Sequence, residues 1–178
     1  MTLALQRRHF SAKLASLALH LGVGMTTAVS PAWAQETALP VPDSLPDVAT
    51  SAARQGEPLV LLISLSGCPY CELVRRNYLL PARINGLPVW QINMLDKQRP
   101  LIGFDGQASH AAEQIARWKA RLAPTVLFLN AQGQELAERL VGIASVDFYG
   151  AYLDERIAKS RQAINTKSGQ RYPPIYSF

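Results

Sequence analysis

Residues 58–71 read PLVLLISLSGCPYC, a continuous apolar run that ends at two cysteines. The length and branched residues of 58–65 predict a strand buried on both faces of a sheet. A Ser-Gly dipeptide interrupts the run, and a helix is predicted to begin at Cys68 or Pro69, because proline is favoured at a first helical position. The helix is expected to stop before Pro81, since proline is resisted inside a helix.

Patterns on either side of this stretch predict the rest of the domain. Further strands are predicted at 87–95, 125–129 and 135–141, the last two joined by a turn at 130–134. Helices are predicted at 47–55 with Asp47 as cap, from Ser109 to about 121, and from 145 to about 161. Strand–helix–strand units favour parallel pairing with helices over the sheet, and the closing hairpin adds an antiparallel edge. The fold class is therefore α/β, with a central mixed sheet of about four strands flanked by helices.

The first 34 residues have the pattern of a cleavable export signal. Arg7, Arg8 and Lys13 form a positive front, residues 14–25 are mostly apolar, and small residues in 32–34 precede a cut before residue 35. A membrane anchor is the alternative, but the apolar run is about a dozen residues and a bilayer span needs about 20. The paired arginines are also typical of twin-arginine signals, so both that route and the general secretory route stay open.

The rest of the chain divides into three parts. Residues 35–46 are interpreted as a linker because they contain three prolines and many small residues. Residues 47–161 form the predicted domain, and 162–178 form a C-terminal tail. Residues 96–107 are interpreted as an insertion that forms a solvated loop or, alternatively, one wall of a groove.

Charge gives little support for nucleic-acid binding. The whole chain carries +5, but without residues 1–34 there remain 15 basic and 13 acidic side chains, a net charge of +2. A nucleic-acid binder should show a stripe of basic residues, and the chain after residue 34 shows none in its sequence. We expect a protein that does not stay inserted in a membrane after cleavage, and a monomer.

The chain contains only two cysteines, Cys68 and Cys71. Residues three apart lie on one face of a helix, so the two sulfurs can meet. The helix N-terminus favours a thiolate through its unpaired N–H groups and partial positive charge. Cys68 lies at the tip and is expected to attack a disulfide, while Cys71, one turn inside, resolves the mixed disulfide.

Other uses of such a pair fit the sequence less well. Structural zinc usually needs four ligands, and beyond residue 34 only His110 offers another common nitrogen or sulfur ligand. Covalent haem needs histidine after the second cysteine, where Glu72 stands. A structural disulfide across two residues closes a very small loop and gains little from chain entropy. No metal is expected.

Two motifs together resemble the thioredoxin superfamily. One is Gly67-Cys68-Pro69-Tyr70-Cys71 after a buried strand, and the other is Ala123-Pro124-Thr125 opening a later strand. Gly133 in the hairpin turn and Val141-Gly142 at its end add to the likeness. The resemblance implies a thioredoxin-like fold with a cis Pro124 facing the cysteines. It also implies a substrate groove at Pro69, Tyr70, Ala123 and Pro124, and no bound cofactor.

The sequence departs from thioredoxins proper at two places. The position of their buried acid is occupied by Leu62, which leaves the proton of Cys71 without that partner. The dipeptide between the cysteines is Pro-Tyr, which is similar to glutaredoxins and some periplasmic disulfide-exchange proteins. Glu72 beside the motif acts to raise the cysteine pKa, whereas Arg75 and Arg76 act to lower it, and the balance of these charges stays open at this point.

With the predicted leader, the resemblance implies a periplasmic thiol:disulfide oxidoreductase, leaning towards a reductase. Its expected partners are cysteine-containing exported proteins and a membrane or periplasmic redox partner that supplies electrons. Oxidase and isomerase remain open, since they share the motif. The alternative is a non-catalytic binding module of the same fold, either chaperone-like or copper(I)-handling, because two thiolates can hold a soft ion.

Overall fold

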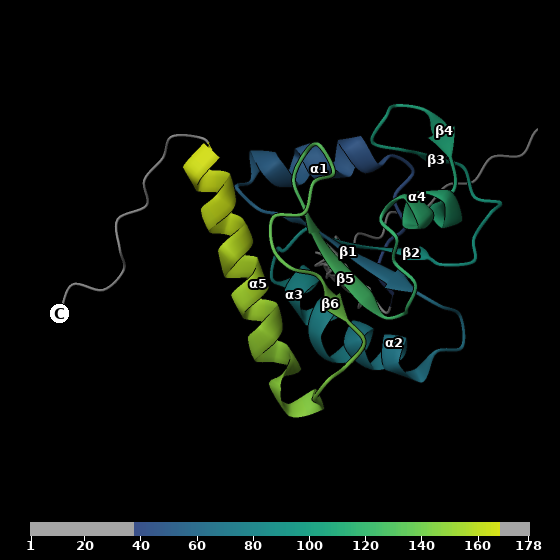
Figure 1. Cartoon of the computed structure of the whole chain (residues 1–178). Helices are drawn as coiled ribbons and strands as arrows, with labels where there is room; N and C mark the ends of the chain where they lie inside the picture. The colour runs from purple at the N-terminus through teal and green to yellow at the C-terminus, as the bar shows by residue number, and fades with distance from the viewer. Residues whose placement is uncertain (1–37, 168–178) are drawn as a thin grey trace, which may run out of the picture. The chain divides into compact units, whose positions relative to one another are not determined.

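The computed structural model describes residues 38–167 and contains a four-stranded mixed sheet in the order β2-β1-β5-β6 (Figure 1). These strands are β1 Leu59–Ser64, β2 Val89–Asn93, β5 Thr125–Leu129 and β6 Leu140–Val141. β1 runs parallel to β2 and antiparallel to β5, and β5 pairs antiparallel with β6. The predicted α/β class and its mixed sheet of about four strands are confirmed.

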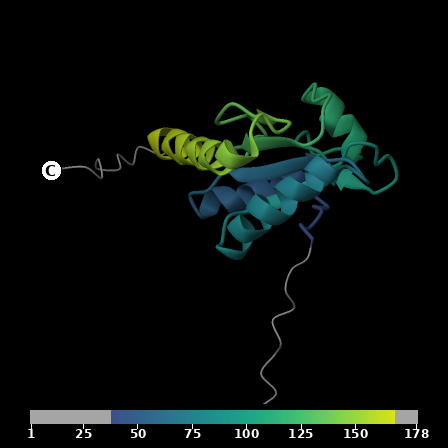
Figure 2. The ribbon, with the colours of Figure 1, turned by 90° about the horizontal axis from the view of Figure 1, so that it is seen from below.

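Helices cover both faces of this sheet (Figures 1 and 2). Every residue of β1 is buried, as expected for a continuous apolar strand at the centre. Val60 and Leu62 point to the face covered by α2 Pro69–Val74, η1 Arg75–Leu79, α3 Leu80–Ile84 and α5 Val146–Lys167. Leu61 and Ile63 point to the opposite face, covered by α1 Leu45–Arg54 and α4 Ala111–Arg117.

The helix that follows the cysteines is longer than predicted. It begins at Pro69 but continues through the π-helical turn η1 into α3 and ends at Ile84, so the expected stop before Pro81 is wrong. In the wide turn, the Leu80 N–H donates to the Arg75 carbonyl, five residues back. Pro81 then lies in the first turn of α3, where a missing N–H is tolerated.

The described part of the predicted linker is packed against the domain. Leu39 is buried, and the Pro40 carbonyl accepts a hydrogen bond of 2.9 Å from the backbone N–H of Gln91 in β2. Residues 39–40 therefore lie along the edge of β2 that β1 leaves free. α1 begins at residue 45 and is capped by Ser44, whose Oγ accepts from the Asp47 N–H, so Asp47 is not the cap.

Residues 96–107 are not simply a solvated loop. They contain β3 Leu101–Ile102, which pairs with β4 Ala108–Ser109 in a second, antiparallel sheet. Leu101 is buried in the core under α1 and α4, and Phe104 of the same hairpin packs against that core, whereas Ile102 is exposed. Next to β4, His110 and not Ser109 caps α4, since His110 Nδ1 accepts from the Glu113 N–H at 3.2 Å.

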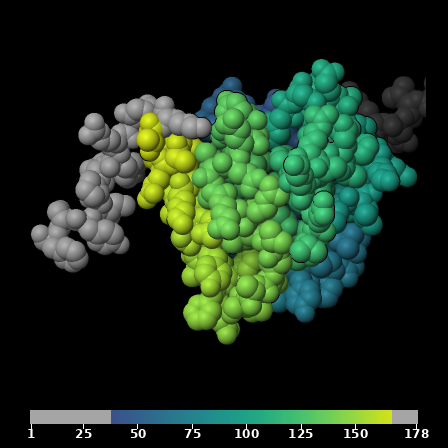
Figure 3. Space-filling view, in the orientation of Figure 1, coloured from purple at the N-terminus to yellow at the C-terminus, as the bar shows by residue number. Residues whose placement is uncertain are grey.

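The C-terminal part of the domain differs from the prediction at two places. The return strand expected over 135–141 is reduced to β6 and an isolated bridge between Leu129 and Glu135. α5 continues past 161 to Lys167, so the first residues of the predicted tail are helical. In the space-filling view the green segment after β5 lies between α5 and the teal α4 region (Figure 3).

The predicted signal peptide (1–34), residues 35–37 and the tail from 168 onwards lie outside the described residues. Within 38–167, no helix is both long and apolar enough to cross a membrane.

Candidate active site

Cys68 occupies the N-terminal cap of α2. Gly67, with a φ of +75°, turns the chain out of β1, and this left-handed conformation favours glycine. The Cys68 N–H then donates to the Leu65 carbonyl at 3.2 Å. The Cys68 sulfur accepts a hydrogen bond of 3.3 Å from the Cys71 N–H, so one of the unpaired N–H groups of the helix tip points at the sulfur.

A second loop faces Cys68 from the start of β5. The Ala123–Pro124 peptide is cis, as predicted, and the Cys68 sulfur lies 3.9 Å from the Ala123 carbonyl oxygen. Two hydrogen bonds hold this loop: Thr125 Oγ1 donates to Leu122 O at 2.7 Å, and the Gly142 N–H donates to Pro124 O at 2.8 Å. Cys68 therefore lies between a helix tip and a cis-proline loop.

The two cysteines differ in exposure in the way their predicted roles require. Both are free thiols; Cys68 is half-buried, whereas Cys71 is 1% exposed. Burial raises the pKa of the Cys71 thiol, and the hydrogen bond with Cys68 adds to the rise. The Leu65 backbone and the Ser64 side chain act in the opposite direction and lower the pKa of Cys71.

Charged side chains beside the cysteines are paired with one another. Glu72 forms ion pairs with both Arg75 and Arg76, one turn further along the helix. The side chain of Arg75 is only 16% exposed and also donates to Ser64 and Gln91. The negative charge of Glu72 is thus paired with two arginines.

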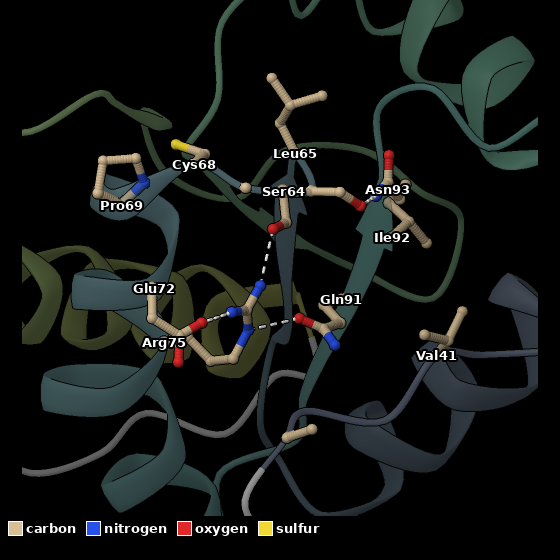
Figure 4. Close-up of a pocket in the computed structure, with 13 residues that line it drawn as sticks. Val41, Ser64, Leu65, Cys68, Pro69, Glu72, Arg75, Gln91, Ile92 and Asn93 are labelled. Carbon is tan, nitrogen blue, oxygen red and sulfur yellow. Dashed lines mark hydrogen bonds and ion pairs between the residues drawn. The ribbon is translucent and has the colours of Figure 1, made fainter.

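An open pocket of about 720 Å³ lies against Cys68 on the β2 side (Figure 4). Its walls come from the end of β1, from α2 and from β2, and Arg75 lies on its floor with hydrogen bonds to Ser64 and Gln91. Residues 96–107 do not line it.

Comparison with known families identifies the kind of domain. Residues 45–157 match the family model described as a thioredoxin-like domain. This chain belongs to the thioredoxin-like family. No curated protein matches it significantly.

Solved structures of similar fold include two plant thioredoxins. Thioredoxin NaTrxh from Nicotiana alata is 21% identical, with 63% of this chain and 80% of that chain covered and a TM-score of 0.42. Oxidised thioredoxin O2 from Arabidopsis thaliana is 15% identical over 68% and 96%, with a TM-score of 0.43. A thioredoxin-fold protein from Helicobacter pylori is 16% identical over 77% and 96%, with a TM-score of 0.40. These likenesses concern the fold alone.

The thioredoxin-like fold brings together four of the six residues predicted for the site. Cys68 and Cys71 lie next to each other, and Ala123 and Pro124 face Cys68. Pro69 and Tyr70 follow Cys68 on the exposed side of α2, where Tyr70 is 61% exposed.

Sequence reasoning missed the residues under the cysteine pair. The sequence places Ser64 in one predicted strand and Gln91 in another, and gives no sign that both contact Arg75. Arg75 lies four residues after Cys71, and this helical spacing was a signal that it faces the same side. Tyr149 of α5 is buried against Tyr78, and burial with the nearby Tyr78 and Cys71 raises the pKa of its hydroxyl; no local pattern could have shown this.

Metal ligands do not gather near the site. Among residues 38–167 there is no group of three or more His, Cys, Asp or Glu side chains placed to hold a metal ion.

Proposed function

We propose that this protein is an exported thiol–disulfide oxidoreductase that acts in the bacterial periplasm as a reductase of cysteine-containing exported proteins. The observation that carries the proposal is the position of Cys68. Its sulfur is half-buried at a helix tip, 3.9 Å from the carbonyl of a cis-proline loop, with a buried second cysteine one turn below.

The proposed reaction uses both cysteines. The Cys68 thiolate attacks a partner disulfide, so that one partner sulfur forms a bond to Cys68 and the other leaves and takes up a proton. Cys71 then attacks the Cys68 sulfur, and the second partner sulfur leaves. The partner disulfide gains two electrons, and the Cys68–Cys71 pair becomes a disulfide.

The electrostatics around the pair support the reductase direction. A strongly oxidising pair needs a stabilised reduced form. Here burial disfavours the Cys71 thiolate, and Arg75 and Arg76 are each paired with Glu72. Burial therefore gives no stabilisation to a thiolate at Cys71, which favours a low reduction potential.

The substrate is proposed to bind as an extended segment along the cis-proline loop. Ala123 and Pro124 supply backbone next to Cys68, while Tyr70 and Leu122, each 61% exposed, supply apolar surface. No bound cofactor takes part, because electrons come from a membrane or periplasmic redox partner.

The reduction potential of the pair is the first test, measured by equilibration with glutathione buffers. A value near −270 mV, roughly that of thioredoxin, is expected, whereas a value near −120 mV, roughly that of the strongest oxidant of the superfamily, would reverse the direction. Cys68→Ser is expected to abolish reduction of a disulfide substrate, and Cys71→Ser to trap mixed disulfides.

A pair that never forms a reversible disulfide contradicts the enzyme. Tight copper(I) binding by the reduced protein, lost when both cysteines are replaced by serine, then favours the binding module. The location is tested separately, by recovery of a chain that begins at residue 35 from the periplasmic fraction.

A further inference from the structure

The loop between α4 and β5, just before the cis-proline peptide, carries two cations (Figure 1). Both Lys119 and Arg121 are exposed, and neither forms an ion pair with any other of residues 38–167. No acidic residue occurs between positions 114 and 134 of the sequence. The loop therefore presents a net positive charge at its surface.

Hydrogen bonds hold both ends of this loop. The Trp118 carbonyl accepts from Arg139 Nη1 at 2.9 Å at one end, and the Leu122 carbonyl accepts from β5 at the other. Lys119 follows the end of α4 with a φ of +54°, and it is the one residue other than glycine with a positive φ within 38–167. Glycine is the usual residue at such a helix end. The helix end and these bonds therefore determine where both side chains leave the loop.

The loop leads directly to the reactive sulfur. The Ala123 carbonyl oxygen lies 3.9 Å from the Cys68 sulfur. Arg121 is two residues before Ala123, so their Cα atoms are at most about 7 Å apart. An extended partner segment covers the same span with two residues. A partner side chain two or three positions from the reacting cysteine therefore lies beside Arg121 when the segment follows this loop.

We propose that Lys119 and Arg121 select partner proteins that carry acidic residues within about four positions of the reactive disulfide. The proposal rests on the proposed function and deepens it by naming the substrate class. The two side chains make and break no bond in the exchange. They determine specificity, because a positive surface beside Cys68 raises the rate at which a negatively charged segment reaches the sulfur.

Acidic side chains on the neighbouring elements are compensated within the domain. Glu72 of α2 pairs with two arginines of η1, and Glu135 pairs with Arg139. The Asp96 carboxylate accepts two backbone N–H groups of its own turn. Asp147 lies in the first turn of α5, where the helix N-terminus counters its charge. These acids therefore leave the positive charge of the loop available to a partner.

The first experiment measures the electrostatic potential at Cys68 without relying on turnover. In a Cys71→Ser background, the remaining thiol is modified by anionic sulfonatoethyl or cationic trimethylammonioethyl methanethiosulfonate. The ratio of the two rate constants does not depend on the pKa of the thiol, because both reagents react with the same thiolate. Replacing Lys119 and Arg121 together by glutamine should lower the anionic-to-cationic ratio about fivefold at low salt, the effect of two exposed ion pairs. The change should be smaller at about 1 M salt, which screens these charges.

Arg54→Gln is the matched control. Arg54 is also exposed and has no ion pair with another of the described residues, but it ends α1 and precedes β1, whereas Cys68 follows β1. The strand between them is about 20 Å long, twice the screening length of about 10 Å at 0.1 M salt. Arg54→Gln should therefore leave the ratio unchanged. The same ratio in the double variant and in the unaltered loop overturns the proposal, and so does an equal fall in Arg54→Gln.

The second experiment measures selection between peptides. The reduced protein is mixed with peptides whose single cysteine is a 2-thiopyridyl disulfide, flanked by aspartates in one peptide and by lysines in the other. Release of the uncharged thiopyridone reports attack by Cys68. The acidic peptide should react about fivefold faster, and the double variant should remove the difference. Equal rates for the two peptides overturn the proposal. If neither peptide reacts, the proposed function fails, while the methanethiosulfonate ratio still decides whether these cations draw anions to Cys68.

Discussion

Gly133→Ala should destabilise the domain by more than its backbone conformation alone requires. Gly133 has a φ of +76°, and a Cβ built on it would lie 2.5 Å from the Phe104 ring. Gly106 has the same φ, but a Cβ there would meet nothing within 4 Å. The two alanine variants therefore carry the same backbone strain and differ in the steric clash.

The two magnitudes can be separated by this comparison. Gly106→Ala is expected to lower the free energy of unfolding by about 1–2 kcal/mol, the cost of a left-handed alanine. Gly133→Ala should lose roughly another 1–3 kcal/mol, because the ring must shift in a packed site. Phe104 packs edge-on against Trp118 with ring centroids 6.3 Å apart, so its movement disturbs that contact as well.

Urea unfolding of the reduced protein, followed by circular dichroism, measures both variants. In a double-mutant cycle, Phe104→Ala should remove most of the extra loss caused by Gly133→Ala. Equal unfolding free energies for Gly133→Ala and Gly106→Ala would refute the clash. Simple additivity of Phe104→Ala with Gly133→Ala would also refute it.

Three further predictions concern buried or capping groups. Because its pKa is raised, Cys71 keeps its proton to higher pH in the folded protein than in the unfolded chain. The free energy of unfolding should therefore fall as pH rises above about 8.5, by up to about 1.4 kcal/mol per pH unit. In urea unfolding, this free energy should depend less on pH for Cys71→Ala, and the same dependence in both proteins contradicts the prediction. The Tyr149 hydroxyl is buried without a hydrogen-bond partner among the described residues. Tyr149→Phe should therefore leave the melting temperature unchanged or raise it, with a gain of up to about 1 kcal/mol in the free energy of unfolding. A clear decrease in the melting temperature would contradict this. His110→Ala should cost about 1 kcal/mol by removing the cap of α4, and His110→Ser should restore it in the same urea assay; equal losses in both variants would exclude a capping role.

The sheet was predictable because its strongest signal is local. Residues 59–64 are apolar at nearly every position, and a strand of this kind is stable only at the centre of a sheet. β5 shares this pattern, and its predicted bounds agree with the structure. β6 is limited to Leu140 and Val141, and among the residues between β5 and β6 one bridge, from Glu135 to Leu129, continues the pairing.

The errors have a common physical origin in contacts between distant segments. Leu39 and Leu101 lie in polar or proline-containing stretches, and each is buried only because another element offers a surface for it. Pro81 was expected to end a helix, but a π-helical turn removes the need for its N–H. Local propensity carries no information on either effect.

Part of the candidate site could be predicted from local motifs, and part depends on contacts between distant segments. The cysteine pair and Pro124 could be identified because they stand in short motifs with known spacing. Ser64, Arg75 and Gln91 could not, because their contacts depend on how β1, η1 and β2 lie relative to one another.

The segment along the free edge of β2 has a consequence for solubility. Gln91 donates from its backbone to Pro40 and from its side chain to Leu39, so these residues occupy part of an otherwise open strand edge. A chain shortened to begin at residue 45, where the family match starts, would expose that edge and the apolar surface beneath Leu39. Exposed edges of this kind pair with other chains and seed aggregation. Residues 39–40 thus protect the sheet from self-association.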